Sequence, residues 1–233
     1  MKKILFAAAA MAAALFASCD KNDETINSVI PEAADGARIA ITLIGAGDTE
    51  TRAFFDTTAK AEAWESSLST LSVFAFDKSG TLIVRRDFTS AELASKSATF
   101  ALPKSTAGTE CSFYAVANYD ASSAKTKAAL TALVENSAAA YNGTFAEVST
   151  KAKRSGGFVM SGSVTKTVGA VNTTTNIGIT LKRTVAKVAL QTTIDPSFSQ
   201  KYGGLLTVNS VKLSKAASQS LVVAGTPTPG TMT

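Results

Sequence analysis

The chain has 233 residues, of which 45% are hydrophobic, and its formal net charge at neutral pH is +5. This length and hydrophobic content suffice for one or two domains with a buried core. The chain contains no histidine and only two cysteines, so it lacks the commonest general base, the commonest metal ligand and the cysteines of a disulfide scaffold. Basic residues do not cluster with aromatic ones, which argues against nucleic acid as a partner. We expect no cofactor and no metal site.

The N-terminus has the pattern of an export signal. Two lysines precede an apolar run of about fourteen residues, which is too short for a membrane-spanning helix. Ala17 and Ser18 stand directly before Cys19, as at the cleavage site of a bacterial lipoprotein, although Phe16 occupies the place of the usual leucine. We therefore predict a lipoprotein signal peptide over residues 1–18 and a lipid on Cys19. The alternative is an ordinary export signal followed by a chance cysteine.

A tether and a first strand follow the signal. Residues 19–36 are polar and acidic, and we interpret them as a flexible tether. In the next segment, 37–44, Ile39, Ile41 and Leu43 alternate with polar or small residues. This period of two predicts a strand with one buried face.

Further short apolar segments with turn signals between them predict more strands. Segment 68–77 is apolar on both faces, as in a central strand, and a turn at 77–80 joins it to a strand at 81–85. Thr89 and Glu92 have the spacing of a capping box, which predicts a short helix through about Ser95. The remaining predicted strands lie at 98–102, 111–118, 156–162, 177–181, 184–190, 205–213 and 220–223.

One segment breaks this pattern. Residues 122–140 are rich in alanine and carry Leu130, Leu133 and Val134 at helical spacing, so they predict one amphipathic helix. Cys111 lies in an apolar run, and we interpret it as a small buried hydrophobic residue rather than a reactive thiol. Many short strands with few helical segments predict an all-β fold with a minor helix, built as an antiparallel β-sandwich.

Four features, taken in order, resemble the N-terminal part of the major fimbrial subunits (fimbrillins) of Bacteroidales. The first is the lipoprotein signal followed by an acidic tether and a strand. The others are the sequence Thr51-Arg52-Ala53-Phe54 followed by the strand 71–77, the apolar strand 113–118 that ends in Ala-Asn, and the pair of segments 158–162 and 181–188. The resemblance covers roughly residues 1–190.

The resemblance implies a fold and a mode of assembly. Fimbrillins have two transthyretin-like β-sandwich domains in tandem and reach the outer membrane as lipoproteins. A surface protease specific for arginine then cuts after the first strand, and a strand from another subunit fills the vacated groove, so that subunits polymerise into an adhesive fimbrium. Carried onto this sequence, the lipid is on Cys19, the cut falls between Arg52 and Ala53, and the displaced strand is 37–44, with Ile39, Ile41 and Leu43 on its apolar face.

On this basis residues 37–190 are expected to form the N-terminal fimbrillin-like domain. Residues 191–233 are then the start of a second domain or a truncated tail, and no donor strand is recognisable in the chain. The expected partners are other fimbrial subunits, the arginine-specific protease and, before cleavage, the outer membrane through the lipid.

Two other classes of function stay open. The first is a non-polymerising outer-membrane lipoprotein that binds a glycan or a host ligand, for which the single tryptophan, Trp64, is a weak candidate contact. The second is an enzyme. Without histidine a Ser/His arrangement is impossible, and no pair of carboxylates stands out for glycoside chemistry. We therefore predict that the protein is not an enzyme.

Overall fold

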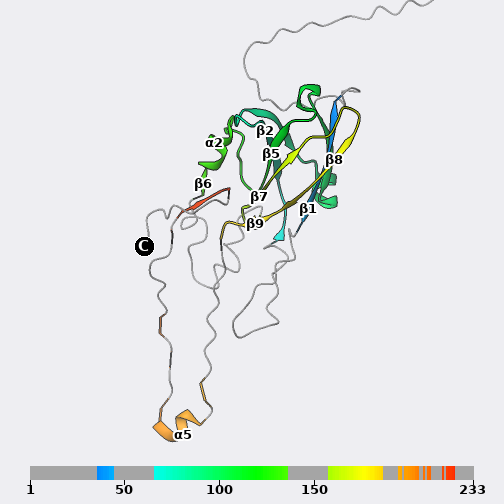
Figure 1. Ribbon diagram of the computed structural model, residues 1–233. Coiled ribbons are helices and arrows are strands. Elements are labelled where there is room, and N and C mark those ends of the chain that lie inside the picture. Colours follow the sequence, from blue (N-terminus) through cyan, green and yellow to red (C-terminus); the bar gives the residue numbers. More distant parts are fainter. Residues whose placement is uncertain are drawn as a thin grey trace, which may run out of the picture.

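A β-sandwich forms the described part of this computed structural model (Figure 1). The predicted all-β fold with minor helices is confirmed. The described residues are 36–44, 66–135 and 157–185, together with 194–195, 197–204, 207, 209–210, 217 and 219–223.

The larger sheet has five strands in the order β3-β2-β5-β7-β9, and every neighbouring pair is antiparallel. Its central strand pair, β2 with β5, is the most deeply buried, since all six residues of β2 are buried. This agrees with the apolar character of both faces of segment 68–77. The bounds of the strands are Leu71–Phe76 (β2), Leu82–Asp87 (β3), Glu110–Ala117 (β5), Met160–Thr167 (β7) and Lys182–Arg183 (β9).

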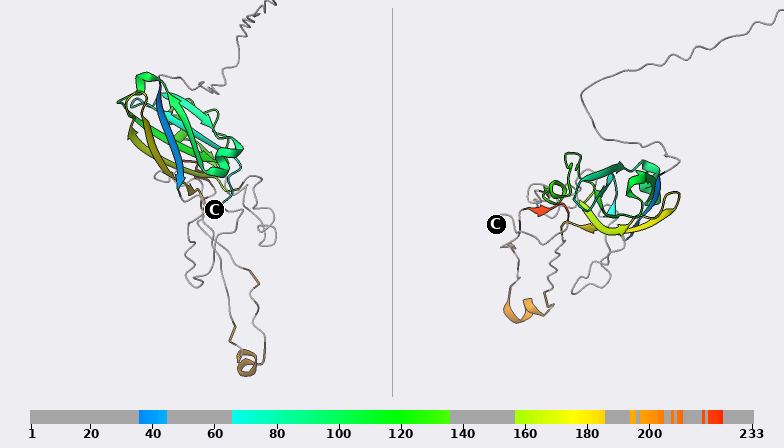
Figure 2. Two further views of the ribbon diagram at one scale, coloured as in Figure 1. Left: turned by 90° about the vertical axis from the view of Figure 1, so that its right-hand side faces the viewer. Right: turned by 45° about the horizontal axis from the view of Figure 1, so that its top comes forward.

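The smaller sheet has three strands in the order β4-β1-β8. Their bounds are Ala37–Ile44 (β1), Ser97–Leu102 (β4) and Thr174–Thr180 (β8). Strand β1 runs antiparallel to β4 but parallel to β8, which is the one parallel ladder among the described strands. In the left view of Figure 2, β1 is the blue strand between its two neighbours.

The main hydrophobic core lies between the two sheets. Strand β8 carries Ile177 and Ile179 inward, and the chain then crosses at the buried Leu181 into β9 of the opposite sheet. At this side of the sandwich the chain therefore passes directly from the smaller sheet to the larger one. Other buried members of this core are Ala37, Ile39, Ile41, Leu43, Leu71, Val73, Ala75, Val84, Leu102, Cys111, Phe113, Ala115 and Met160.

A second core covers the outer face of the larger sheet. It is formed by Phe74 and Phe76 of β2 with Leu130 of α2 (Lys127–Thr131) and with Val222 and Val223 near the C-terminus. The rings of the two phenylalanines are stacked, with centroids 6.2 Å apart. Beside this core a two-stranded sheet pairs β6 (Val134–Glu135) with β10 (Ser220–Leu221).

The predicted helix over 122–140 is wrong. Of the described residues 122–135 only Lys127–Thr131 is helical, and the chain then returns to strand in β6. The Thr126 side chain accepts a hydrogen bond from the Ala129 amide and so begins the helix late. Val134 pairs with Leu221, which lies far along the sequence, so a tertiary contact replaces the helical turn that the local pattern favours.

The remaining helices of the described residues are short. Helix α1 (Ser90–Ser95) begins at Thr89, and both hydrogen bonds of the predicted capping box with Glu92 are present. The others are a 3₁₀ turn, η2 (Lys104–Thr106), and α5 (Phe198–Tyr202), in which the two terminal rings contact each other with centroids 4.9 Å apart. No helix in the described ranges is both long and apolar enough to span a membrane.

Several strand predictions differ from the structure in their bounds or lie largely outside it. The strand predicted at 177–181 is Thr174–Thr180, and of that predicted at 220–223 only Ser220–Leu221 is a strand. The strand predicted at 156–162 begins only at Met160 and continues to Thr167. Just before it, Gly157 has φ +90°, and a Cβ there would come within 2.7 Å of the Ser67 carbonyl oxygen, so this close approach of two loops requires glycine. Most of the strands predicted at 184–190 and 205–213 lies outside the described residues.

Candidate functional site

The candidate site is β1 together with the trough that it fills, which is the space between the neighbouring strands β4 and β8 over the main core. Its hydrogen-bonded register is continuous on both sides, from Ala37–Leu102 to Thr42–Ser97 against β4 and from Arg38–Thr174 to Ile44–Thr180 against β8. A strand with neighbours on both sides satisfies its backbone groups completely within the sheet. Removal of β1 would therefore leave two facing rows of unpaired backbone groups, one on β4 and one on β8.

The inward face of β1 is fully buried. Ile39, Ile41 and Leu43, the predicted apolar face, are 0%, 1% and 5% exposed. Ala37 also points inward and is completely buried, whereas Arg38, Thr42 and Ile44 on the opposite face are exposed. The strand thus presents one small residue and three large aliphatic residues to the core, at alternate positions.

Both ends of β1 are fixed by further backbone hydrogen bonds. At its beginning the Arg38 amide donates to the Thr173 carbonyl (3.1 Å). At its end the Leu43 amide donates to the Lys96 carbonyl (2.9 Å), and the Leu181 amide donates to the Ile44 carbonyl (3.2 Å). The strand is thus an integral part of the sheet as the chain stands.

The other predicted site residues lie outside the described residues. These are Cys19 with its predicted lipid and Arg52 with Ala53 at the predicted cut. Trp64 also lies outside them. The structure therefore brings together Ile39, Ile41 and Leu43 alone.

The chain enters β2 through a clamp that sequence reasoning missed. Asn118 has φ +58°, and its side-chain oxygen accepts a hydrogen bond from the Ser69 amide (2.9 Å). Its side-chain nitrogen donates to the carbonyl oxygens of Ser67 (2.8 Å) and Phe158 (2.7 Å). Asn118 thus links residues 67–69, which precede β2, to the end of β5 and to Phe158 just before β7. The signal that could have found it is an asparagine directly after an apolar strand, since asparagine tolerates a positive φ.

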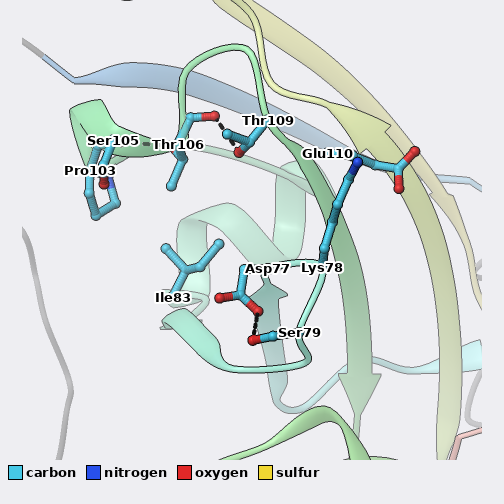
Figure 3. Close-up of a pocket in the computed structure, with 9 residues that line it drawn as sticks. All are labelled: Asp77, Lys78, Ser79, Ile83, Pro103, Ser105, Thr106, Thr109 and Glu110. Atoms are coloured by element: carbon cyan, nitrogen blue, oxygen red, sulfur yellow. Dashed lines mark hydrogen bonds between the residues drawn. The ribbon is translucent and has the colours of Figure 1, made fainter.

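A pocket of about 460 Å³ lies at the end of the sandwich where β1 begins (Figure 3). The Asp77 carboxylate accepts a hydrogen bond from the Ser79 hydroxyl (2.6 Å), and this bond with that from the Thr81 amide holds the Asp77 pKa below its ordinary value. The Thr106 and Thr109 hydroxyls donate to carbonyl oxygens of their own loop. The side chains of Asp77, Ser79, Thr106 and Thr109 thus form hydrogen bonds within the turns that line the pocket. It is lined by Asp77, Lys78, Ser79, Ile83, Pro103, Ser105, Thr106, Thr109 and Glu110.

Little else in the described residues suggests chemistry. No group of three or more aspartate, glutamate or cysteine residues there is arranged to hold a metal ion. Cys111 is 1% exposed, as predicted, and burial raises the pKa of its thiol, which disfavours the reactive thiolate.

The family follows from a comparison of the sequence with known families. Residues 37–219 match the sequence model of the major fimbrial subunit protein (FimA) family. The chain belongs to this family. It is a family of structural fimbrial subunits rather than of enzymes, so the predicted resemblance is confirmed over the matched residues and the protein is assigned to the fimbriae of the cell surface.

One solved structure supports the β-sandwich at the level of the fold, and two others are similar over part of the chain. The chain is similar to a fimbrial assembly protein from Parabacteroides distasonis ATCC 8503, with a TM-score of 0.54 and 16% identity over 85% of this chain and 72% of that one. A protein from Bacteroides eggerthii DSM 20697, provisionally assigned to cell adhesion, matches with a TM-score of 0.43 and 21% identity over 64% of this chain. The tip fimbrial protein Mfa3 from Porphyromonas gingivalis matches with a TM-score of 0.42 and 15% identity over 64% of this chain.

The fimbrial chain spans less than half of the length of two of these relatives. It covers 41% of the Bacteroides eggerthii protein and 48% of Mfa3. No curated protein matches the chain significantly. The family assignment therefore rests on the matched residues 37–219. The fimbrial assembly protein supports the β-sandwich fold that the structure shows.

Proposed function

We propose that the chain is the lipidated precursor of a fimbrial subunit that assembles by β-strand exchange. Lipid on Cys19 holds the precursor at the outer membrane, and an arginine-specific surface protease cuts between Arg52 and Ala53. A strand from another subunit then replaces β1, and the resulting fibre supports adhesion. The observation that carries the proposal is the place of β1, a fully paired middle strand whose last residue, Ile44, is separated from the proposed cut only by residues 45–52.

The energetics of the trough support replacement rather than simple loss of the strand. Full burial of a large aliphatic side chain is worth about 1.5–3 kcal/mol, so Ile39, Ile41 and Leu43 together contribute roughly 5–9 kcal/mol before ordering costs. Strand loss would also leave the facing edges of β4 and β8 unpaired, and such edges accept an added strand. A vacated trough is therefore a strong site for an extended segment of alternating apolar pattern.

The domain division belongs to the same proposal. Residues 37–190 would be the domain that receives the strand, and residues 191–233 would be either the start of a second domain or a truncated tail. The described part of that second segment includes Val222 and Val223, which are buried against the outer face of the larger sheet, opposite the trough. Strand exchange at β1 would leave this contact in place.

The experiment compares two arginine variants in a bacterium that displays the fimbrium. Strand-exchanged polymers resist detergent, so the wild-type protein should give a ladder of bands on an unheated SDS gel. Arg52→Ala should abolish the ladder and leave a lipidated monomer. Arg38→Ala removes an exposed arginine within β1, where a paired backbone resists proteases, and should assemble like the wild type. Assembly of the Arg52→Ala protein at the wild-type level would refute cleavage at this position.

A further inference from the structure

The two walls of the trough are held in very different ways. Strand β4 pairs with β1 alone among the described strands, because it is the edge of the smaller sheet. Strand β8 is also an edge strand, but it is bound to β7 of the opposite sheet. The Lys166 ammonium donates to the Asn176 carbonyl (2.8 Å), and the Gly169 amide donates to the Thr175 hydroxyl (2.8 Å) in the turn that joins the two strands. Beyond its end the chain enters β9, which pairs with β7.

The contact between β7 and β8 is a close approach of backbones. A Cβ on Gly162 of β7 would come within 2.2 Å of the Thr180 carbonyl oxygen, so the two strands touch at this point. Such an approach requires glycine. If β1 leaves, β8 therefore keeps its support while β4 loses its ladder. In this sense β8 is the fixed wall of the trough and β4 is the free one.

The fixed wall carries a notch on its outer face at Gly178. Glycine inside a strand marks either a bulge or a close approach, and the unbroken register from Arg38–Thr174 to Ile44–Thr180 leaves no room for a bulge in this ladder. A Cβ on Gly178 would lie 2.8 Å from Ile44 Cδ1 and 3.7 Å from Ile44 Cγ1, with no other heavy atom of a non-adjacent described residue within 4 Å. The Ile44 side chain, 53% exposed, thus lies over the glycine.

The notch discriminates against a shift in the register of the inserted strand that the inward face does not prevent. A slip of one residue turns the apolar side chains of a strand to solvent and is rejected by the core. A slip of two residues keeps the same side chains inward, so the alternating pattern discriminates against it only weakly. In the native register Ile44 is paired with Thr180, and its side chain reaches back over Gly178. A slip of two residues moves this side chain from Gly178 to Asn176 or to Thr180 on the outer face, and both of these residues have a Cβ where the glycine has none.

We propose that β8 is the wall that orients and registers the incoming strand, and that Gly178 determines which strand is accepted. The partner is an extended eight-residue segment of another subunit that runs parallel to β8. It carries a small residue at position one, large aliphatic residues at positions three, five and seven, and a further large aliphatic residue at position eight that lies over Gly178. These positions correspond to Ala37, Ile39, Ile41, Leu43 and Ile44 of β1. The inference rests on the strand exchange proposed above and adds its specificity.

The test measures binding of synthetic strands to the full chain after it has been cut at Arg52. The probe is a fluorescent peptide with the sequence of residues 37–44, and its exchange with the resident fragment gives an apparent affinity. A second peptide has alanine in place of the isoleucine at position eight. A third, the matched control, has alanine in place of the threonine at position six. Thr42 is paired with Gly178 in the ladder and also faces outward, but none of its atoms lies within 4 Å of a Cβ built on Gly178.

The half-buried isoleucine sets the size of the expected effect. The alanine peptide loses about half of the free energy that full burial of an aliphatic side chain provides. This loss corresponds to roughly three- to tenfold weaker binding of the position-eight peptide. The control peptide should bind within about twofold of the parent, since exposed positions contribute little. In the Gly178→Val protein the notch is filled, so the isoleucine and alanine peptides should bind equally. Gly178→Ala gives the same comparison in a milder variant, because only the flexible end of the Ile44 side chain must move.

Three results would overturn the proposal, and they are distinguishable. Equal binding of the parent and position-eight peptides to the wild-type chain would refute a role for the notch while leaving strand exchange intact. If both Gly178 variants still bind the isoleucine peptide more tightly than the alanine peptide, the selectivity does not come from Gly178. Failure of the parent peptide to enter the cut wild-type chain at all would refute strand exchange itself, and with it the specificity proposed here.

Discussion

Ile41→Ala tests how much the smaller sheet depends on β1. Ile41 is 1% exposed and lies in register between Ala98 of β4 and Ile177 of β8. The substitution removes three carbon atoms, worth about 2.4 kcal/mol at roughly 0.8 kcal/mol for each methylene. A cavity remains where the neighbours cannot close in, so the total loss of stability should be about 2–5 kcal/mol.

The assay is urea unfolding of the uncut chain, followed by circular dichroism. A loss of this size lowers the unfolding midpoint by roughly 1–2 M urea for a small domain. Thr42→Ala is the matched control, because Thr42 is the next residue of the same strand and faces solvent. It should change the stability by no more than about 0.5 kcal/mol.

The comparison of the two variants decides the outcome. If Ile41→Ala and Thr42→Ala unfold at the same urea concentration, β1 does not hold its side chains in the core, and the trough described above does not exist. If Ile41→Ala is destabilised only while the chain is uncut, the lost energy belongs to β1 as a separable strand.

Three further substitutions test other parts of the fold. Asn118→Ala removes the hydrogen bonds of the clamp before β2 and should cost about 2–4 kcal/mol in urea unfolding; a loss below about 0.5 kcal/mol would contradict the clamp. Gly162→Ala forces a Cβ against the β8 backbone and should lower the melting temperature by several degrees, which corresponds to about 1–3 kcal/mol. Gly204→Ala, whose Cβ would meet no described atom within 4 Å, should leave it unchanged. The Asp77 carboxylate, whose pKa is depressed by its turn, stabilises the fold above the ordinary aspartate pKa of about 3.9 and loses this effect as the pH falls through the folded value. Asp77→Asn should therefore reduce the acid sensitivity of unfolding, and an NMR titration that gives an ordinary Asp77 pKa would contradict this.

Local sequence patterns predicted the elements that local interactions determine. The alternation of Ile39, Ile41 and Leu43 identified both β1 and its buried face, since a period of two corresponds directly to the geometry of a strand. Thr89 and Glu92 identified α1, because a capping box closes within four residues. The resemblance to fimbrillins, carried by short strands in a shared order, led to the family that the matched residues 37–219 establish.

Elements that depend on distant partners could not be predicted in this way. The helix expected over 122–140 gave way to β6 because Val134 pairs with Leu221, which a local pattern does not reveal. The parallel ladder of β1 with β8 was missed for the same reason, since alternation determines a face but not the direction of a neighbour. The contact of Ile44 with Gly178 depends on the parallel pairing of β1 with β8, which local alternation does not predict.

The most direct test of the account is the N-terminus of the protein in its own fimbriae. Intact mass and N-terminal peptide mapping of the surface protein identify the first residue of the assembled chain. The account predicts a mature chain that begins at Ala53, without residues 19–52 and therefore without its own β1. An assembled chain that still begins at lipid-modified Cys19 would contradict strand exchange and leave an anchored surface subunit.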